Sequence, residues 1–283
     1  MWRVYSDIRS STDDMYEEVE GQDQRREQSV DVDSGEDPFS ILLLGLDTGE
    51  FGREEQGRSD SIMIMTVNPN TDQATMISVP RDTYTEIIGR GTEDKINHAY
   101  AFGGVPMTIN TVQNLFNFPV DYYVSVNMEA IQEIIDSIGG IEITPPLTFT
   151  HTDFDFVKGQ QTHMDGARAL AYSRMRYDDP RGDYGRQERQ REVLETTIKK
   201  FATLDSILNY RTVLDSLSSN MQTNLSFDDI VDVFSKYSNS ANNIEQVQLT
   251  GSGRKVDGGY YEFIPDEEVE RVSSILKTEL EIN

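Results

Sequence analysis

The chain of 283 residues contains no cysteine and 50 acidic against 25 basic residues, so its formal net charge is −25 at pH 7. The lack of cysteine excludes disulfides and cysteine-based zinc sites, and the acidic balance argues against nonspecific binding to a nucleic-acid backbone or to an anionic lipid surface. Hydrophobic residues make up 36% of the chain, which is enough for a sizeable core, and the length allows one large domain or two small ones.

Residues 1–38 are predicted to form an acidic arm or stalk ahead of the folded domain. They carry twelve Asp or Glu and four Arg, with few apolar residues. A segment of this composition buries too little apolar surface to offset the entropy lost on ordering it, so we expect a solvated linker. The folded domain is then expected to span residues 39–283.

Strands and helices alternate along the rest of the chain. Apolar runs bounded by turn residues predict the strands, and apolar residues three and four positions apart predict the helices. In chain order we expect strands at Ile41–Asp47, Ser61–Val67 and Ala74–Val79, a helix at Val105–Phe116, a strand at Tyr122–Val126, a helix at Met128–Ile138, a strand at Ile141–Thr144, helices at Asp165–Met175, Arg186–Leu204, Ile207–Ser218 and Phe227–Tyr237, a strand at Gln246–Leu249 and a helix from Pro265 to Glu279. Ser226 is a typical N-cap, and Pro265 is a typical first helical residue. The alternation predicts an α/β fold with a central mixed sheet flanked by helices.

Seven arginines fall between Arg168 and Arg191, on a chain in which cations are scarce. Arginine presents a planar, permanently charged fork that matches phosphate oxygens two at a time. Arg174 and Arg176 can reach one cleft together, while Arg186 and Gln190 share a face near a predicted helix N-terminus, which attracts anions. The competing interpretation is a set of surface ion pairs with nearby acidic residues, namely Asp178, Asp179, Asp183 and Glu188. For the cluster as a whole we favour the binding of phosphate groups, with a diphosphate as the expected ligand.

Two aspartates flank the loop between the first two predicted strands. Asp47 ends the first strand and Asp60 immediately precedes the second. If these strands are neighbours, both carboxylates lie at one edge of the sheet, and two Asp oxygens with diphosphate oxygens make a typical Mg²⁺ site. The spacing equally allows Asp47 to cap a turn and Asp60 to pair with Arg58. Arg81, at the end of the third strand, can reach the same edge.

Seven motifs, taken in chain order, resemble the LytR–CpsA–Psr family of Gram-positive and related bacteria. The motifs are Leu44–Asp47, Gly57–Asp60, Ser78–Asp82, Lys95–Tyr100, Gly139–Ile141, Ala169–Arg176 and Asp183–Gln190. The resemblance covers about residues 40–200 strongly and the rest loosely. It implies a sheet between helical layers, with an apolar lipid tunnel between the sheet and the helices.

The resemblance implies a phosphotransferase that moves a glycopolymer from a polyprenyl-diphosphate carrier to peptidoglycan, forming a phosphodiester bond. The polymer would be wall teichoic acid, capsule or another secondary wall polymer, and the cofactor Mg²⁺ or Mn²⁺. Members of the family usually have one N-terminal transmembrane helix and an extracellular catalytic domain. No run in this sequence approaches the roughly 18 apolar residues of a spanning helix. We therefore expect this chain to be the extracellular part of a protein anchored by one helix to the bacterial plasma membrane, with the acidic arm as its stalk.

The resemblance also assigns roles to individual residues. Asp47 and Asp60 correspond to the metal-associated carboxylates. The diphosphate-binding set corresponds to Arg58, Arg81, Arg174, Arg176, Arg186 and Gln190. The residues expected to be catalytic are Asp60, Arg81, Arg174 and Arg176, and two accessory positions are Lys95 and Asp183. The candidate lining of the lipid tunnel is Ile109, Val112, Leu115, Phe116, Val124, Ile134 and Ile138.

Two other functions remain open from the sequence. With water as the acceptor, the same site would make the protein a lipid diphosphate hydrolase. Without turnover, the protein would be a binding or regulatory module for lipid-linked glycans. Asp47 and Asp60 argue against this second alternative, because a pure anion-binding site gains nothing from carboxylates beside the phosphate.

Overall fold

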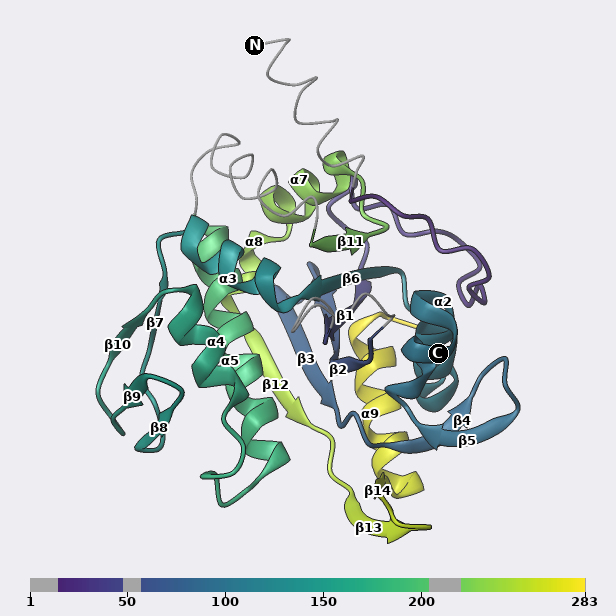
Figure 1. Ribbon diagram of the computed structural model, residues 1–283. Coiled ribbons are helices and arrows are strands. Elements are labelled where there is room, and N and C mark those ends of the chain that lie inside the picture. Colours follow the sequence, from purple (N-terminus) through teal and green to yellow (C-terminus); the bar gives the residue numbers. More distant parts are fainter. Residues whose placement is uncertain (1–14, 48–56, 204–219, 283) are drawn as a thin grey trace. The chain divides into compact units, whose positions relative to one another are not determined.

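The computed structural model describes residues 15–47, 57–203 and 220–282 (Figure 1). It contains two compact units. The sheet unit comprises Tyr16–Ser125 and Gln222–Asn283, and the helical unit comprises Met1–Met15 and Val126–Met221. The helix expected at Ile207–Ser218 lies outside the described residues.

A six-stranded mixed sheet forms the centre of the sheet unit, in the order β11-β6-β1-β2-β3-β12. Its strands are β1 (Phe39–Leu46), β2 (Ser59–Asn68), β3 (Gln73–Val79), β6 (Tyr122–Asn127), β11 (Met221–Thr223) and β12 (Ile244–Gln248). Strands β1, β2 and β3 pair antiparallel, and β12 pairs with β3 in parallel. Nearly every residue of β1, β2 and β3 is buried, which suits their continuous apolar sequences. The predicted α/β class with a mixed sheet is confirmed.

Helices α2 (His98–Phe116) and α9 (Asp266–Glu279) cover one face of this sheet (Figure 1). Alternate residues of the central strands, such as Leu44 and Ile64, share one hydrophobic core with Ile109 of α2 and Leu276 of α9. Each of these four side chains is almost completely buried. Burial of such a side chain stabilises the fold by roughly 1.5–3 kcal/mol. The neighbouring helices α7 (Phe227–Lys236) and α8 (Ser238–Asn242) follow β11 in the chain.

The boundaries of three helices show where sequence patterns were incomplete. Helix α2 begins at His98 rather than at Val105, because the non-helical Gly103 and Gly104 kink it and interrupt the apolar period. Ser226 caps α7 as predicted, with a complete capping box. Pro265 is the N-cap of α9 and not its first helical residue.

The helical unit is built on α3 (Met128–Ser137), α4 (Gly166–Arg174) and α5 (Asp183–Ala202), of which α4 packs against both others. A Cβ at Gly166 would lie 2.4 Å from the Gln132 carbonyl oxygen, so α3 and α4 approach closely only because this residue is glycine. The unit also holds the predicted strand β7 (Ile141–Ile143), which pairs with β10 (Thr162–Met164). Several strands of three to five residues were not predicted, because they are too short to show a clear apolar pattern. Among them are the hairpin strands β4 (Tyr84–Ile87), β5 (Thr92–Lys95), β8 (Phe149–His151) and β9 (Phe154–Phe156).

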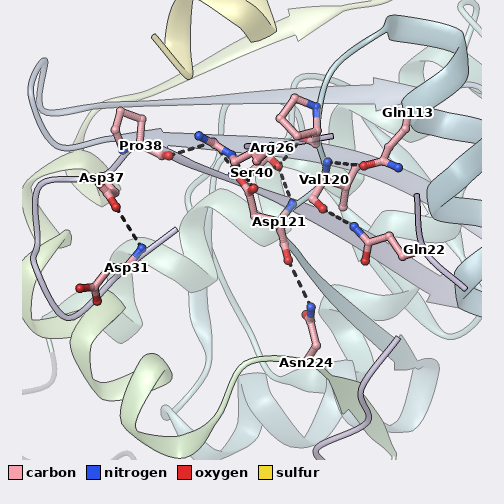
Figure 2. A network of polar contacts seen from close by, with 11 residues as sticks. Gln22, Arg26, Asp31, Asp37, Pro38, Ser40, Gln113, Val120, Asp121 and Asn224 are labelled. Carbon is pink, nitrogen blue, oxygen red and sulfur yellow. Dashed lines mark hydrogen bonds and ion pairs between the residues drawn. The ribbon is translucent and has the colours of Figure 1, made fainter. Parts of the chain in front are cut away.

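The described part of the acidic arm is attached to the sheet unit and does not form a solvated linker (Figure 2). The Arg26 guanidinium donates to both carboxylate oxygens of Asp121, at 2.6 and 3.0 Å, and to the Pro38 carbonyl at 3.0 Å. Gln22 donates to the Val120 carbonyl at 2.6 Å. The Asp121 carboxylate is 8% exposed and also accepts from the amide and hydroxyl of Ser40. Composition favoured disorder here, but these polar contacts, with the buried Val32 and with Val19 packed against the core, hold the segment in place.

Replacing Arg26 by alanine should lower the free energy of unfolding by about 3 kcal/mol, because the buried Asp121 carboxylate would lose its cation. The midpoint of urea unfolding measures this change. Arg25→Ala is the matched control, since the exposed Arg25 donates only to the Gln113 carbonyl and the Asn117 side chain. The control should stay within about 1 kcal/mol of the wild type. Equal effects of the two substitutions would contradict the importance of the Asp121 contact.

Candidate functional site

Asp47 and Asp60 lie at the same end of two neighbouring strands. β1 and β2 pair along their length, with a register shift at Gly45 and Leu46. Just beyond it, the Asp47 amide donates to the Arg58 carbonyl at 3.1 Å, so the two chains remain adjacent on leaving the sheet. The condition stated for a two-carboxylate site, that the strands be neighbours, is therefore met.

A line of alternating charges continues from Asp60 across this edge of the sheet unit. The Arg81 guanidinium donates to Asp60 at 2.8 Å and lies 3.8 Å from the carboxylate of Asp82. Lys95 in turn donates to Asp82 at 2.7 Å. We call Asp60, Arg81, Asp82 and Lys95 the sheet-edge charges. The structure thus pairs Asp60 with Arg81, and not with Arg58 as the alternative from the sequence had it.

Backbone hydrogen bonds hold the loop that carries these charges. Both the amide and the hydroxyl of Thr83 donate to the Pro80 carbonyl, at 2.9 and 2.7 Å. The Asn97 amide donates to the Arg81 carbonyl at 3.2 Å, and the Ile96 amide to the Thr83 carbonyl at 2.8 Å. Arg81 and Lys95 therefore project from a fixed backbone, which reduces the entropy lost when their side chains bind a ligand.

The sheet edge offers two carboxylates to a divalent cation. Among the residues described, no three His, Asp or Glu side chains form a cluster that could hold a metal ion. A cage made by protein alone is therefore not found in that part of the chain. Mg²⁺ commonly binds through one or two carboxylates and completes its octahedral shell with water and substrate phosphate. The positions of Asp47 and Asp60 fit this second kind of site.

A buried ion pair organises the arginine-rich segment of the helical unit. Arg189, on α5, is 1% exposed, and its guanidinium binds the Asp179 carboxylate, which is fully buried. The same guanidinium donates to the carbonyl oxygens of Tyr172, at 3.2 Å, and of Met175. Arg189 therefore ties the end of α4 and the loop after it to α5. The sequence offered Asp179 as one of four possible ion-pair partners of the arginines, but it did not predict that its pair with Arg189 is buried.

The loop between α4 and α5 is shaped around the Asp179 carboxylate. Asp179 accepts from the Arg181 amide at 2.8 Å. A Cβ at Gly185 would lie 1.9 Å from the same carboxylate, so no other residue fits there. Burial by itself raises the pKa of Asp179, but the Arg181 amide and the Arg189 guanidinium outweigh it and hold the pKa below its ordinary value of 3.8. Gly182, with φ of 58°, then leads into α5 at Asp183, three residues before the predicted start.

Four of the seven arginines are not among the residues expected to bind diphosphate. Arg189 and Arg191 are buried, Arg181 pairs with Glu188, and Arg168 lies over the ring of Phe156 at 5.7 Å. The ion-pair interpretation was therefore right for part of the cluster. The remaining three, Arg174, Arg176 and Arg186, are the residues expected to bind diphosphate, and we call them the arginine set.

Asp183 connects two members of the arginine set. Its carboxylate lies 2.7 Å from the Arg186 guanidinium and 3.7 Å from that of Arg176. Arg186 stands in the first turn of α5, where free N–H groups favour an anion, and Gln190 follows one turn later. Arg174 is the last residue of α4. Asp183 thus acts as a positioning residue that holds Arg176 and Arg186 at the start of this helix.

The residues expected to line a lipid tunnel are distributed over both units. Ile109, Val112 and Phe116 are fully buried in the core between the sheet and α2, with Leu115 at its margin. Ile134 and Ile138 belong to the helical unit. The tunnel remains a prediction. Within the described ranges, no helix combines the length and apolar composition required to cross a membrane.

The chain is similar to proteins of known family. It matches the model of the LytR_cpsA_psr family over residues 3–278. Over 278 residues it is 46% identical to the polyisoprenyl-teichoic acid–peptidoglycan teichoic acid transferase TagU of Enterococcus faecalis (strain ATCC 700802 / V583), covering 98% of this chain and 90% of that protein. The crystal structure of B. subtilis TagU is 42% identical, with a TM-score of 0.70 over 88% of this chain and 99% of that one. A structure of TagT bound to LIIa-WTA is 33% identical, with a TM-score of 0.77 over 92% and 97% of the two chains.

Replacing Arg189 by methionine should cost about 3–5 kcal/mol of unfolding free energy, because it leaves the Asp179 carboxylate buried without its cation. Chemical denaturation followed by circular dichroism measures this loss. Arg181→Ala is the control at the exposed end of the same network, where the guanidinium is 48% exposed. It should cost about 1 kcal/mol or less. A mild effect of Arg189→Met would show that the loop does not depend on the buried pair.

The stability contributed by Asp179 should depend on pH. Because its pKa is lowered in the folded protein, this contribution is complete above the unfolded pKa of about 3.9 and is lost as the pH falls toward the lower folded pKa. The excess stability of the wild type over Asp179→Asn should therefore shrink below about pH 4. Denaturation midpoints of both proteins between neutral and strongly acidic pH test this. A stability difference between the two proteins that grows on acidification would contradict the lowered pKa of Asp179.

Proposed function

We propose that this chain, which belongs to the LytR–CpsA–Psr family, transfers teichoic acid from a polyprenyl-diphosphate carrier to peptidoglycan. The observation that carries the proposal is the 46% identity, over 98% of the chain, to a protein named as that transferase. The related TagT has been solved in a structure bound to LIIa-WTA. The arginine set and the sheet-edge charges supply the side chains that such a reaction needs.

Transfer of a phosphoryl group requires positioning of the reactants and neutralisation of charge more than covalent participation of the protein. In the helical unit, Arg174, Arg176 and Arg186 would bind the diphosphate oxygens, since guanidinium groups match them in pairs. Asp183 already holds two of these arginines beside the N-terminus of α5. The arginines therefore need little reorganisation as negative charge develops on the phosphate.

The reaction proceeds with a balanced exchange of bonds at phosphorus. A sugar hydroxyl of peptidoglycan, expected to be the C6 hydroxyl of an amino sugar, attacks the phosphorus bonded to the first sugar of the polymer. The bond from that phosphorus to the bridging oxygen breaks, and polyprenyl monophosphate leaves. The hydroxyl proton passes to a carboxylate, for which Asp60 in the sheet unit is the candidate. A phosphodiester then joins the polymer to peptidoglycan.

Asp47 and Asp60 would hold the Mg²⁺ or Mn²⁺ of this enzyme. A divalent cation bound there supplies positive charge to the phosphate oxygens. Arg81 already neutralises part of the charge of Asp60, to which it donates at 2.8 Å. Both substrates are located outside the plasma membrane, so we place the protein at its extracellular face, anchored to it by an N-terminal helix.

Replacing Arg174 and Arg176 together by alanine should reduce transfer by a factor of about 100 or more, because two charges that bind the diphosphate are removed. The measurement is transfer of labelled polymer to peptidoglycan. Mass spectrometry of lipid extracted from the purified protein provides an independent readout: a polyprenyl phosphate that co-purifies with the wild type should be lost from the variant.

Arg168→Ala is the matched control, since the Arg168 guanidinium lies over an aromatic ring and donates to the Asp155 carbonyl. It should retain transfer. Full transfer by the double variant would contradict the role of the arginine set. Release of polymer phosphate at the same rate with and without peptidoglycan would identify the protein as a hydrolase instead.

A further inference from the structure

An exposed aromatic ring is fixed in place on a hairpin of the sheet unit. The hairpin consists of β13 (Ser252–Val256) and β14 (Gly259–Phe263), and every residue of β13 is exposed (Figure 1). Tyr260 is 44% exposed. No step of the proposed reaction uses it.

Two contacts set the orientation of the Tyr260 ring. Its hydroxyl donates to the carboxylate of Glu262 at 2.8 Å, and Glu262 is only 4% exposed. A Cβ at Gly253 would lie 1.9 Å from the Tyr260 hydroxyl, so the ring lies across the bare backbone of the neighbouring strand. A ring held in this way loses little freedom when a ligand packs on it.

The hairpin also carries positive charge that is not neutralised by ion pairs. Lys255 stands directly opposite Tyr260 in the strand pairing, and Arg254 precedes it. In the part of the chain that the structure describes, neither side chain forms an ion pair with a carboxylate, and Arg254 instead lies 3.6 Å over the ring of Phe263. Because successive residues of a strand point to opposite faces, Lys255 shares the face of Tyr260, whereas Arg254 lies on the other face. On a chain of net charge −25, a cation beside the Tyr260 ring favours an anionic partner locally.

The hairpin is joined directly to the sheet-edge charges of the same unit. The Glu262 amide donates to the Asp82 carbonyl at 2.9 Å. Tyr84 packs edge-on against Tyr261, with 5.4 Å between ring centroids, and the Lys95 ammonium lies 5.4 Å from the centre of the same Tyr261 ring. A molecule resting on the hairpin is therefore bound to an element that contacts the proposed reaction site.

We propose that Tyr260 and Lys255 form a docking surface for the acceptor, the glycan strand of peptidoglycan. This strand is a chain of amino-sugar rings with apolar C–H faces, which fit a fixed aromatic ring, and its stem peptides carry carboxylates, which fit Lys255. A teichoic acid backbone of polyol phosphates has no ring face to pack on Tyr260. The inference rests on the proposed function and assigns the acceptor surface of that enzyme.

Binding of the whole protein to peptidoglycan sacculi stripped of teichoic acid tests this inference. Tyr260→Ala should weaken co-sedimentation with the sacculi about tenfold, and Lys255→Ala less. Tyr260→Phe keeps the ring and should retain most of the binding. Tyr16→Ala removes a tyrosine of similar exposure, 46%, from the same unit and should bind as the wild type does. Unfolding midpoints confirm that each variant is folded.

The outcomes separate this inference from the proposed function, because binding to sacculi requires no donor. Wild-type binding by Tyr260→Ala would overturn the docking surface even if transfer is intact. If Tyr260→Ala weakened binding to isolated teichoic acid but left binding to sacculi unchanged, the surface would hold the donor. That result would also overturn the inference. Loss of binding to sacculi in Tyr260→Ala, together with a wild type that transfers no polymer, would support the surface and contradict the transferase.

Discussion

The contact between Arg189 and Asp179 is the interaction on which the arginine set depends. Buried charges are costly unless they are paired and fully hydrogen-bonded, and Arg189 meets this requirement through a carboxylate and two backbone carbonyls. The same bonds define the path of the loop that separates Arg174 and Arg176 from Arg186. Arg189, which is buried, thus holds the loop that lies between these arginines.

Ion pairs also position the charged side chains at the sheet edge, where the signs of the charges alternate. Each of the sheet-edge charges contacts a neighbour of opposite sign, so each has a counter-charge close to it. Arg81, shared between two carboxylates, keeps its direction. Such an arrangement is preorganised for a charged ligand and requires no refolding of the loop to accept one.

The sequence predicted the central strands, the main helices and the two neighbouring aspartates, because these rest on apolar periodicity and on the ends of buried strands. The assignment of Arg174, Arg176 and Arg186 to diphosphate binding, made from their spacing and from the family resemblance, stays a prediction. What the sequence did not predict depends on contacts between distant residues. Asp179 looks like any acidic loop residue until Arg189 is placed beside it, ten positions along the chain. Likewise, the composition of residues 16–38 gives no sign of the bond from Arg26 to Asp121, 95 residues away.

Because residues 16–38 are attached to the sheet unit, they do not act as a spacer ahead of it. As a free linker, residues 16–38 would reach about 80 Å when fully extended. Bonded along the sheet unit through Gln22, Arg25 and Arg26, they contribute almost none of that length. For the membrane-anchored enzyme proposed above, the tether would be measured from Tyr16 and not from Pro38. The reaction site would then reach less far into the wall.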